Sequence, residues 1–337
     1  MFKYNIGVVI PFYQRERGIL AKALLSIAAQ QVESTEFTIV IVDDGSPISA
    51  DAELASVALP EHCRIELITQ KNAGPAVARN TALDYLQQCK ISTVAFLDSD
   101  DVWREQHIAE ALSALSLGAG FYFCDHSRFD EKSSWFASLD CFKHWDDTAD
   151  AYNIKLSADK QLAELSGANC FNLFIKDYLS QTSCIVYDFK SQPDARFDPS
   201  LVSAGEDFFL WLQLVTNCKK VIFSFNKNTH CGEGVNIYFD SFDWGKLASS
   251  TQNGYNFILY KMIMSTFSLQ REEYDYVRGK AELYLNRYSF LMVKHLISQE
   301  GFNRRLAVVL LKKFPFSTLS VPFRFIRAAL NRKILQN

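Results

Sequence analysis

Short apolar runs alternate with helix-like segments through the N-terminal part of the chain. The strand-like runs are residues 6–11, 37–42, 64–68 and 93–97. The segments that repeat apolar residues at helical spacing are 20–31, 51–59 and 75–88. Strands that alternate with helices predict βαβ units. We therefore expect an α/β fold with a Rossmann-like, doubly wound and mostly parallel sheet.

Each predicted strand is followed by a polar group. The four groups are Phe12-Tyr13-Gln14-Arg15, Asp43-Asp44-Gly45-Ser46, Lys71-Asn72-Ala73-Gly74-Pro75 and Asp98-Ser99-Asp100-Asp101. Ligands of doubly wound sheets bind beyond the carboxyl ends of the strands, so one crevice can collect all four groups. We expect the functional site there.

The last group places three carboxylates at the end of a buried strand. Like charges this close repel unless a cation or water neutralises them. Mg²⁺ or Mn²⁺ held by one or two carboxylates is the usual way to bind a diphosphate. Asp98 and Asp100 share one face of an extended segment, so both could reach one ion. The alternative is a solvated turn in which Asp101 caps the next helix.

Other residues at the strand ends could bind the base and the phosphate groups of a nucleotide. Asp44 could accept a hydrogen bond from a base N–H with Pro11 and Phe12 beside the ring, although such a sequence is most often a turn. Gly74 would allow the backbone to approach a phosphate closely, and Arg79 would bring positive charge to it. The alternative for Arg79 is an exposed cation on a helix.

The pattern is less regular beyond these strands. Residues 124–165 lack a clear period, and we interpret them as an insertion over the crevice. The elements predicted next are a strand at 183–187, a helix at 207–215 and a strand at 221–225. Helical patterns dominate the remainder, so we expect one domain over residues 1–239 and a helical region over 240–337.

Taken in order, these motifs resemble the inverting family 2 nucleotide-sugar glycosyltransferases of the GT-A fold. The matching segments are Val9-Ile10-Pro11-Phe12-Tyr13, Val42-Asp43-Asp44-Gly45-Ser46, Asn72-Ala73-Gly74-Pro75 with Ala78-Arg79-Asn80, Phe96-Leu97-Asp98-Ser99-Asp100-Asp101 with Trp103, and Gly205-Glu206-Asp207 with Leu210-Trp211-Leu212. The segment from His230 to Tyr238 resembles, more narrowly, bacterial exopolysaccharide glucosyltransferases of the succinoglycan-building type.

The resemblance implies a role for each residue of the site. Asp44 would bind uracil, Asp98 would contact the ribose or the metal, and Asp100 would be the main metal ligand. The nucleotide-sugar site as a whole would comprise Pro11, Phe12, Tyr13, Asp44, Gly74, Arg79, Asp98 and Ser99. His230 would be a further metal or diphosphate contact, although a lone histidine is more often structural. Trp103 and Trp211 could shape the sugar site, with core packing as the alternative for Trp211.

The resemblance also implies that Asp207 is the general base and that Glu206 orients it or binds the acceptor. Inversion requires one base to take the acceptor hydroxyl proton on the face opposite the leaving UDP. The alternative for this acidic pair is a favourable interaction with the dipole of a helix N-terminus.

These motifs predict a metal-dependent inverting hexosyltransferase in bacterial surface polysaccharide synthesis. The donor would be a UDP-sugar, with glucose as the first candidate, and the acceptor a lipid-linked oligosaccharide. The alternative is a non-catalytic nucleotide-sugar-binding component of a membrane-associated assembly. An NAD-dependent oxidoreductase would need a glycine-rich turn after the first strand, where this chain has Phe12-Tyr13-Gln14-Arg15.

Composition limits the class of protein and its expected location in the cell. The 337-residue chain is 48% hydrophobic and 22% charged, which is ordinary for a folded protein and argues against disorder. The eight cysteines are scattered without a Cys-x-x-Cys pair, which argues against a zinc ribbon or a disulfide framework. We find neither a signal-peptide pattern nor an apolar run of about 20 residues, the length of a membrane span. We therefore expect a cytoplasmic protein.

Charge is distributed unevenly along the chain. Net charge is −3, yet the segment from residue 301 onward holds eight Lys and Arg residues and no Asp or Glu. A helix predicted at 322–335 would place Phe323, Ile326, Leu330 and Ile334 on one face and cations on another. Such a tail suits an anionic partner, either a phospholipid surface or nucleic acid, with packing on the catalytic domain as the alternative. A lipid-linked acceptor favours the inner face of the cytoplasmic membrane, and we expect no nucleic acid.

Overall fold

The computed structural model describes residues 3–128, 130, 132–159, 161–202, 204–232 and 243–336. The chain forms two compact units, each with its own packing. The first comprises Met1–Phe197 and Leu210–Val235, and the second comprises Asp198–Phe209 and Asn236–Asn337. One boundary between them falls inside helix α8 (Glu206–Thr216), which therefore belongs to both.

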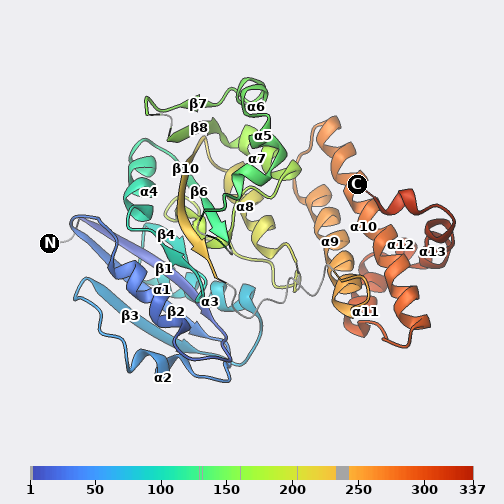
Figure 1. The fold of residues 1–337 in the computed structure, drawn as a ribbon, viewed down its shortest axis with the longest axis horizontal. Helices are drawn as coiled ribbons and strands as arrows, with labels where there is room; N and C mark the ends of the chain where they lie inside the picture. The colour runs from blue at the N-terminus through green and yellow to red at the C-terminus, as the bar shows by residue number, and fades with distance from the viewer. Residues whose placement is uncertain are drawn as a thin grey trace. The chain divides into compact units, whose positions relative to one another are not determined.

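A mixed sheet runs through the first unit (Figure 1). Its strands are β1 (Tyr4–Phe12), β2 (Thr35–Asp43), β3 (Cys63–Thr69), β4 (Thr93–Phe96), β5 (Val102–Trp103), β6 (Phe121–Arg128), β7 (Lys155–Leu156), β8 (Leu162–Ser166), β9 (Val186–Asp188) and β10 (Lys220–Cys231). The order is β3-β2-β1-β4-β9-β6-β10-β8-β7, with β5 paired to β10. The pairs β3–β2, β2–β1, β1–β4 and β6–β10 are parallel, whereas β9 is antiparallel to both of its neighbours. The predicted α/β architecture with a mostly parallel sheet is confirmed.

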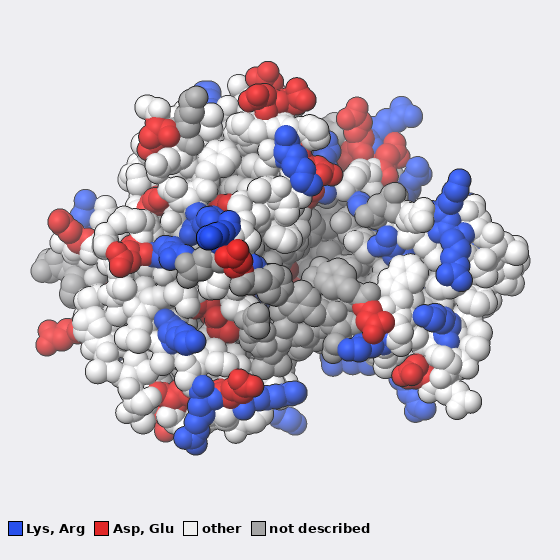
Figure 2. All heavy atoms as spheres, in the orientation of Figure 1, with Lys and Arg blue, Asp and Glu red and all other residues white. Residues whose placement is uncertain are grey.

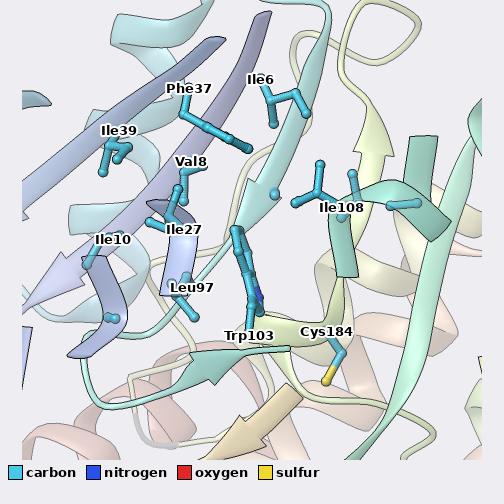
Figure 3. Close-up of a cluster of buried hydrophobic side chains, with 14 of the residues drawn as sticks. Ile6, Val8, Ile10, Ile27, Phe37, Ile39, Leu97, Trp103, Ile108 and Cys184 are labelled. Carbon is cyan, nitrogen blue, oxygen red and sulfur yellow. The ribbon is translucent and has the colours of Figure 1, made fainter. Parts of the chain in front are cut away.

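Four helices in the described part of the chain pack against this sheet. They are α1 (Ile19–Ala28), α2 (Ala50–Leu54), α3 (Pro75–Gln88) and α4 (His107–Ser116). Three of them lie in segments where the apolar pattern predicts a helix, although α2 is shorter than the predicted 51–59. Apolar faces of α1 and α4 meet inward-facing residues of β1 and β2 in one core, where Ile27, Ile108 and Val8 are fully buried (Figure 3). Helix α3 lies close to β1, because a Cβ on Gly7 would come within 2.6 Å of the Leu86 side chain.

Residues 124–165 are more ordered than the sequence suggests. Their first part completes β6, and the rest forms η1 (Phe136–Ser138), α5 (Asp140–Lys143), α6 (Trp145–Ala151), β7 and β8. Strand β8 pairs with β10, so this segment extends the sheet. The interpretation of residues 124–165 as an insertion was therefore wrong in part. Short strands and helices of this kind show no clear hydrophobic periodicity in the sequence. Helix α7 (Gly167–Lys176) and the short turn η2 (Thr182–Cys184) lead into β9, where a single strand was predicted at 183–187.

The second unit is helical apart from its loops. Its helices are α9 (Leu247–Thr266), α10 (Arg271–Ile297), α11 (Arg304–Lys313), α12 (Pro315–Leu319), α13 (Val321–Leu330) and the turn η4 (Arg332–Leu335). A cluster of Phe290, Leu291, Ala328 and Leu335 holds α13 and η4 to α10. None of the helices in the described residues is long and apolar enough to cross a membrane.

The predicted tail helix is interrupted. It ends at Leu330, and the Asn331 side chain accepts a hydrogen bond from the Lys333 N–H at 3.2 Å to start η4. Ile334 consequently leaves the face of Phe323, Ile326 and Leu330 and packs against the cluster on α10. The placement of Ile334 on that face was therefore wrong.

Candidate active site

The loops that follow β1, β2 and β4 are joined by one residue, Gln14, through its backbone and its side chain. Its backbone N–H donates to Ser46 Oγ at 2.7 Å, and the same hydroxyl donates to the Gln14 carbonyl at 2.9 Å. Its side-chain amide donates to Ser99 Oγ at 3.0 Å. The predicted convergence of the strand-end groups is confirmed for these three loops. Ser99 is itself buried, and it acts here as a partner of Gln14.

The two acidic residues after β2 organise the neighbouring loops. Asp43 accepts hydrogen bonds from the backbone N–H groups of Ser46 and Ala50, both at 2.8 Å, and so closes the turn into α2. Asp44 accepts from the backbone N–H groups of Ala73 at 2.9 Å and Gly74 at 2.8 Å. Asp44 thereby fixes the loop before α3.

Gln70 completes the environment of Asp44. Its side-chain amide donates to Asp44 Oδ1 at 2.7 Å, so this oxygen has two donors whereas Oδ2 has one. A carboxylate oxygen has two lone pairs, and Oδ2 therefore keeps one that can accept a further N–H. Gly74 has φ +93°, a conformation that favours glycine at the start of α3.

Arg79 lies inside the site, paired with Asp98. Its Nη2 is 2.7 Å from Asp98 Oδ1, and the Arg79 side chain is only 7% exposed. The guanidinium also packs over the ring of Phe197, 5.2 Å from its centroid. The alternative of an exposed cation on the helix surface is therefore excluded.

Asp100 lies next to Asp98 in a crowded acidic environment. Burial, followed by the charge of Asp98, raises the pKa of Asp100 to about 6 from its ordinary 3.8. A nearby divalent cation would remove this repulsion, so the residues present fit a metal. No group of three His, Cys, Asp or Glu side chains is placed to hold a metal ion in the described part of the chain. Mg²⁺ sites in proteins commonly use one or two carboxylates and complete their coordination with waters and phosphate oxygens.

Asp101 is a structural member of the cluster. It accepts hydrogen bonds from Ser183 Oγ at 2.5 Å and from the Gly232 N–H at 2.8 Å. Burial above all, with the charges of Asp100 and Asp98, raises its pKa. The segment does form a turn, closed by a hydrogen bond of 3.0 Å from the Asp101 N–H to the Asp98 carbonyl. The residue before α4 is Gln106, so Asp101, which is buried, does not cap that helix, and this part of the alternative is wrong.

The end of β10 lies against the carboxylate loop. His230 pairs with Val102 across the β5–β10 ladder, and a Cβ on Gly232 would come within 2.1 Å of the Asp100 carbonyl oxygen. His230 Nδ1 is 2.8 Å from Ser127 Oγ. Its role as a metal or diphosphate contact stays a prediction. Residues 233–238 of the predicted motif lie outside the described residues.

Two aromatic residues predicted near the ligand, Phe12 and Trp103, belong to the core instead, and the core packing considered for Trp211 is confirmed. Phe12 is fully buried in the cluster beneath α1, because the strand turns its side chain inward. Pro11 and Tyr13, on the opposite face, are half-buried. Trp103 is buried in the same cluster and donates its ring N–H to the Ser183 carbonyl at 2.7 Å (Figure 3). Trp211 is also fully buried, so it packs in the core.

Glu206 and Asp207 occupy the first turn of α8 and are half-buried. Asp207 Oδ1 accepts a hydrogen bond from the Phe208 N–H at 2.6 Å. Gly205, with φ +87°, precedes them, and a Cβ there would meet Leu259 of α9 at 2.5 Å. This turn belongs to the second unit. The catalytic roles of Glu206 and Asp207 stay predictions.

Comparison with known proteins identifies the class. The family model described as glycosyl transferase family 2 matches residues 7–180. A succinoglycan biosynthesis protein, ExoW of Rhizobium meliloti, is 35% identical over 242 residues, which are 69% of this chain and 70% of ExoW. An Escherichia coli glucosyltransferase, WfgD, named for transfer from UDP-Glc to α-D-GlcNAc-diphosphoundecaprenol, is 33% identical over 116 residues, 34% of this chain and 42% of WfgD.

A solved structure supports the same fold. Residues 1–349 of Staphylococcus aureus TarS in complex with UDP-GlcNAc superpose with a TM-score of 0.60 and 16% identity, covering 98% of this chain and 90% of that one. The fold is therefore of the GT-A type. The chain belongs to glycosyl transferase family 2 and is a glycosyltransferase.

Proposed function

We propose that this glycosyltransferase is a metal-dependent, inverting hexosyltransferase. It transfers a hexose, with glucose as the first candidate, from a UDP-sugar to a hydroxyl of a lipid-linked oligosaccharide in bacterial surface polysaccharide synthesis. Similarity to a succinoglycan biosynthesis protein supports the pathway class. Similarity to a UDP-Glc-dependent enzyme that acts on a diphosphoundecaprenol acceptor supports the donor and the acceptor.

The observation that carries this proposal is the crowding of Asp98 and Asp100 at the strand ends. Both carboxylates would hold Mn²⁺ or Mg²⁺, and the bound ion would neutralise the charge that grows on the diphosphate. Arg79 holds Asp98 at 2.7 Å and so fixes one of the two carboxylates. Both carboxylates are half-buried, so bulk water screens their charges only in part.

The uridine would lie beside the β2 and β3 loops. The remaining lone pair of Asp44 Oδ2 would accept the N–H of uracil, with Pro11 and Tyr13 as neighbours. Gly74, which the Asp44 carboxylate fixes, would allow the backbone to approach the nucleotide closely. Ser99 and Gln14 would hold the carboxylate loop in place for the sugar.

Asp207 would take the proton of the acceptor hydroxyl, and Glu206 would orient Asp207 or bind the acceptor. Their position in the first turn of α8 gives each carboxylate the favourable interaction with a helix N-terminus.

A surface on α12 and α13 would bring the enzyme to its lipid-linked acceptor. We call it the tail surface, and its apolar members are Phe316, Leu319, Phe323, Ile326 and Leu330. Phe316, Phe323 and Leu330 are 87%, 82% and 84% exposed. In Figure 2 the region of α12 and α13 is mostly white, with blue cationic groups beside it. Apolar side chains flanked by cations suit the inner leaflet of the cytoplasmic membrane, where the enzyme would be peripheral.

Two measurements test the function. Mass spectrometry after incubation with UDP-sugars and a lipid-linked glycan extract should show one product heavier by a hexose. Asp207→Asn should bind UDP normally and lose most transfer, whereas Asp275→Asn, an exposed carboxylate on α10, should transfer normally. Near-normal turnover by Asp207→Asn would exclude it as the base. UDP binding without release of UDP from any donor would contradict the proposed reaction.

A further inference from the structure

Arg128, the last residue of β6, is held firmly by its backbone. Its N–H donates to Ser133 Oγ at 3.0 Å, and its carbonyl accepts from the same hydroxyl at 2.7 Å. The Asp130 N–H donates to that carbonyl at 2.7 Å. The side chain therefore leaves the sheet from a fixed point, at the same edge as the strand-end carboxylates.

The strand register places Arg128 beside the metal site. Arg128 pairs with Cys231 of β10, and the next residue, Gly232, lies directly against the Asp100 backbone. The Gly232 N–H also binds Asp101. Electrostatics agree with this placement, because the positive charge of Arg128 opposes the rise in the pKa of Asp100, and does so more strongly than Arg79.

The guanidinium of Arg128 differs from that of Arg79 in its bonding. Arg79 forms an ion pair with Asp98. Arg128 has no such ion pair among the residues that the structure describes, and its Nε is buried there without a hydrogen-bond partner. A buried charged donor without a partner is unfavourable, and such groups in native proteins generally have a ligand or an ordered water. Arg128 was not among the site residues predicted from the sequence.

We propose that Arg128 binds an anionic oxygen of the donor's diphosphate and remains bound to the leaving UDP. This inference rests on the proposed function. The acceptor oxygen forms a new bond to the anomeric carbon as the bond between that carbon and the diphosphate oxygen breaks. The electron pair of the broken bond stays on the diphosphate oxygen, and the acceptor proton passes to Asp207. Arg128 stabilises the resulting charge together with the metal. A planar guanidinium suits this task, because it offers several N–H groups to neighbouring phosphate oxygens.

Binding measurements with fragments of the donor test this assignment. Isothermal titration of UDP in the presence of Mn²⁺ should show a dissociation constant roughly 10- to 100-fold higher for Arg128→Gln than for the wild type, since one charge-assisted contact is lost. Uridine, which lacks phosphate, should bind both proteins equally. Arg128→Lys should recover part of the affinity. Lys132→Gln, which removes an exposed cation four residues away, should bind UDP like the wild type.

Binding of Mn²⁺ alone, followed by electron paramagnetic resonance, separates a ligand contact from a structural defect. Arg128→Gln should bind Mn²⁺ as well as the wild type or better, because a cation near Asp100 has been removed. Equal loss of uridine, UDP and Mn²⁺ binding would show a structural role and overturn the inference. So would normal UDP binding with impaired transfer, which would assign Arg128 to a phosphate of the acceptor. If the wild type fails to bind UDP with Mn²⁺, the proposed function fails as well.

Discussion

The strand-end loops of the first unit and the tail surface of the second differ in how their side chains are paired. In the loops, Gln14 and Asp44 bond polar groups from four separate segments. On the tail surface, large apolar side chains such as Phe316 and Phe323 face solvent. A soluble surface rarely keeps a contiguous apolar patch without a partner. The loops are thus held by their own hydrogen bonds, whereas the apolar side chains of the tail surface are exposed, as the proposed membrane contact requires.

A second contrast lies within the loops themselves. Asp43 accepts two hydrogen bonds from N–H donors and Asp44 accepts three. Asp98 and Asp100 instead lie close enough for one charge to raise the pKa of the other group. The first pair builds the site, and the second pair supplies the unbalanced charge that a cation would neutralise.

Removal of Asp100 should have the largest effect. Asp100→Asn should lower the rate of UDP release by about 10³-fold, because several kcal/mol of metal-based stabilisation are lost. The metal-free variant should melt at a higher temperature than the wild type at pH 7, since a buried repelling charge has gone. Initial rates and thermal melts measure both, with the exposed Asp159→Asn as a control. A metal-free variant that is less stable and still active would contradict the account.

Removal of Asp44 should act mainly on stability. Asp44→Ala leaves the N–H groups of Ala73 and Gly74 without their acceptor, which should reduce the free energy of unfolding by about 3 kcal/mol. Urea denaturation measures this loss, with Asp51→Ala on the exposed side of α2 as the control. A loss no greater than that of the control would show that the loop does not depend on Asp44.

Polar substitution of the tail surface should leave the folded enzyme intact. The triple variant Phe316→Ser, Phe323→Ser and Leu330→Ser should bind anionic phospholipid vesicles about 100-fold more weakly, because each side chain inserts part of its apolar area. Its transfer to a water-soluble acceptor should not change. Sedimentation with vesicles measures the effect, and Leu25→Ser and Leu117→Ser, exposed in the first unit, serve as controls. Unchanged vesicle binding would remove the tail surface as the docking site.

The smallest effect expected is a pH dependence from His107 in the core of the first unit. Complete burial lowers the pKa of His107 to about 4 from its ordinary 6.5, and its ring stacks on Trp103 at 4.8 Å. The unfolded chain therefore binds this proton first as pH falls, and stability present above pH 6.5 is lost toward pH 4. We expect a loss of about 2 kcal/mol between pH 7 and pH 5. His107→Leu should lack this part of the acid dependence in urea denaturation, and an identical pH profile would exclude His107 as its source.

Hydrophobic patterns predicted well those helices and strands whose bounds depend on nearby residues. Helix α3 was predicted at its observed bounds, because proline marks its first turn and apolar residues recur at helical spacing. The convergence of the loops followed from parallel strands alone. In contrast, the inward side chain of Phe12 could not be predicted, since a strand buried on both faces has no alternating pattern to show which face carries which neighbour.

The sequence did not predict the contacts between residues that lie far apart along the chain. Gln14 meets Ser99 across 85 positions, and Asp101 meets Gly232 across 131. Arg128 enters the site only because β6 pairs with β10 beside Asp100. The spacing of residues along the sequence does not indicate these contacts. Gln14 belongs to the polar group recognised after the first strand, although its contact with Ser99 was not predicted. A polar residue placed at a strand end, next to a long apolar run, is the one sequence signal that could have drawn attention to Arg128.

Titration of UDP into the protein with and without Mn²⁺ tests the central claim most directly. The account predicts tight binding that requires the metal, and loss of this metal dependence when Asp98 and Asp100 are both replaced by Asn. Metal-dependent binding that survives the double substitution, or equally tight binding in a chelator, would contradict it.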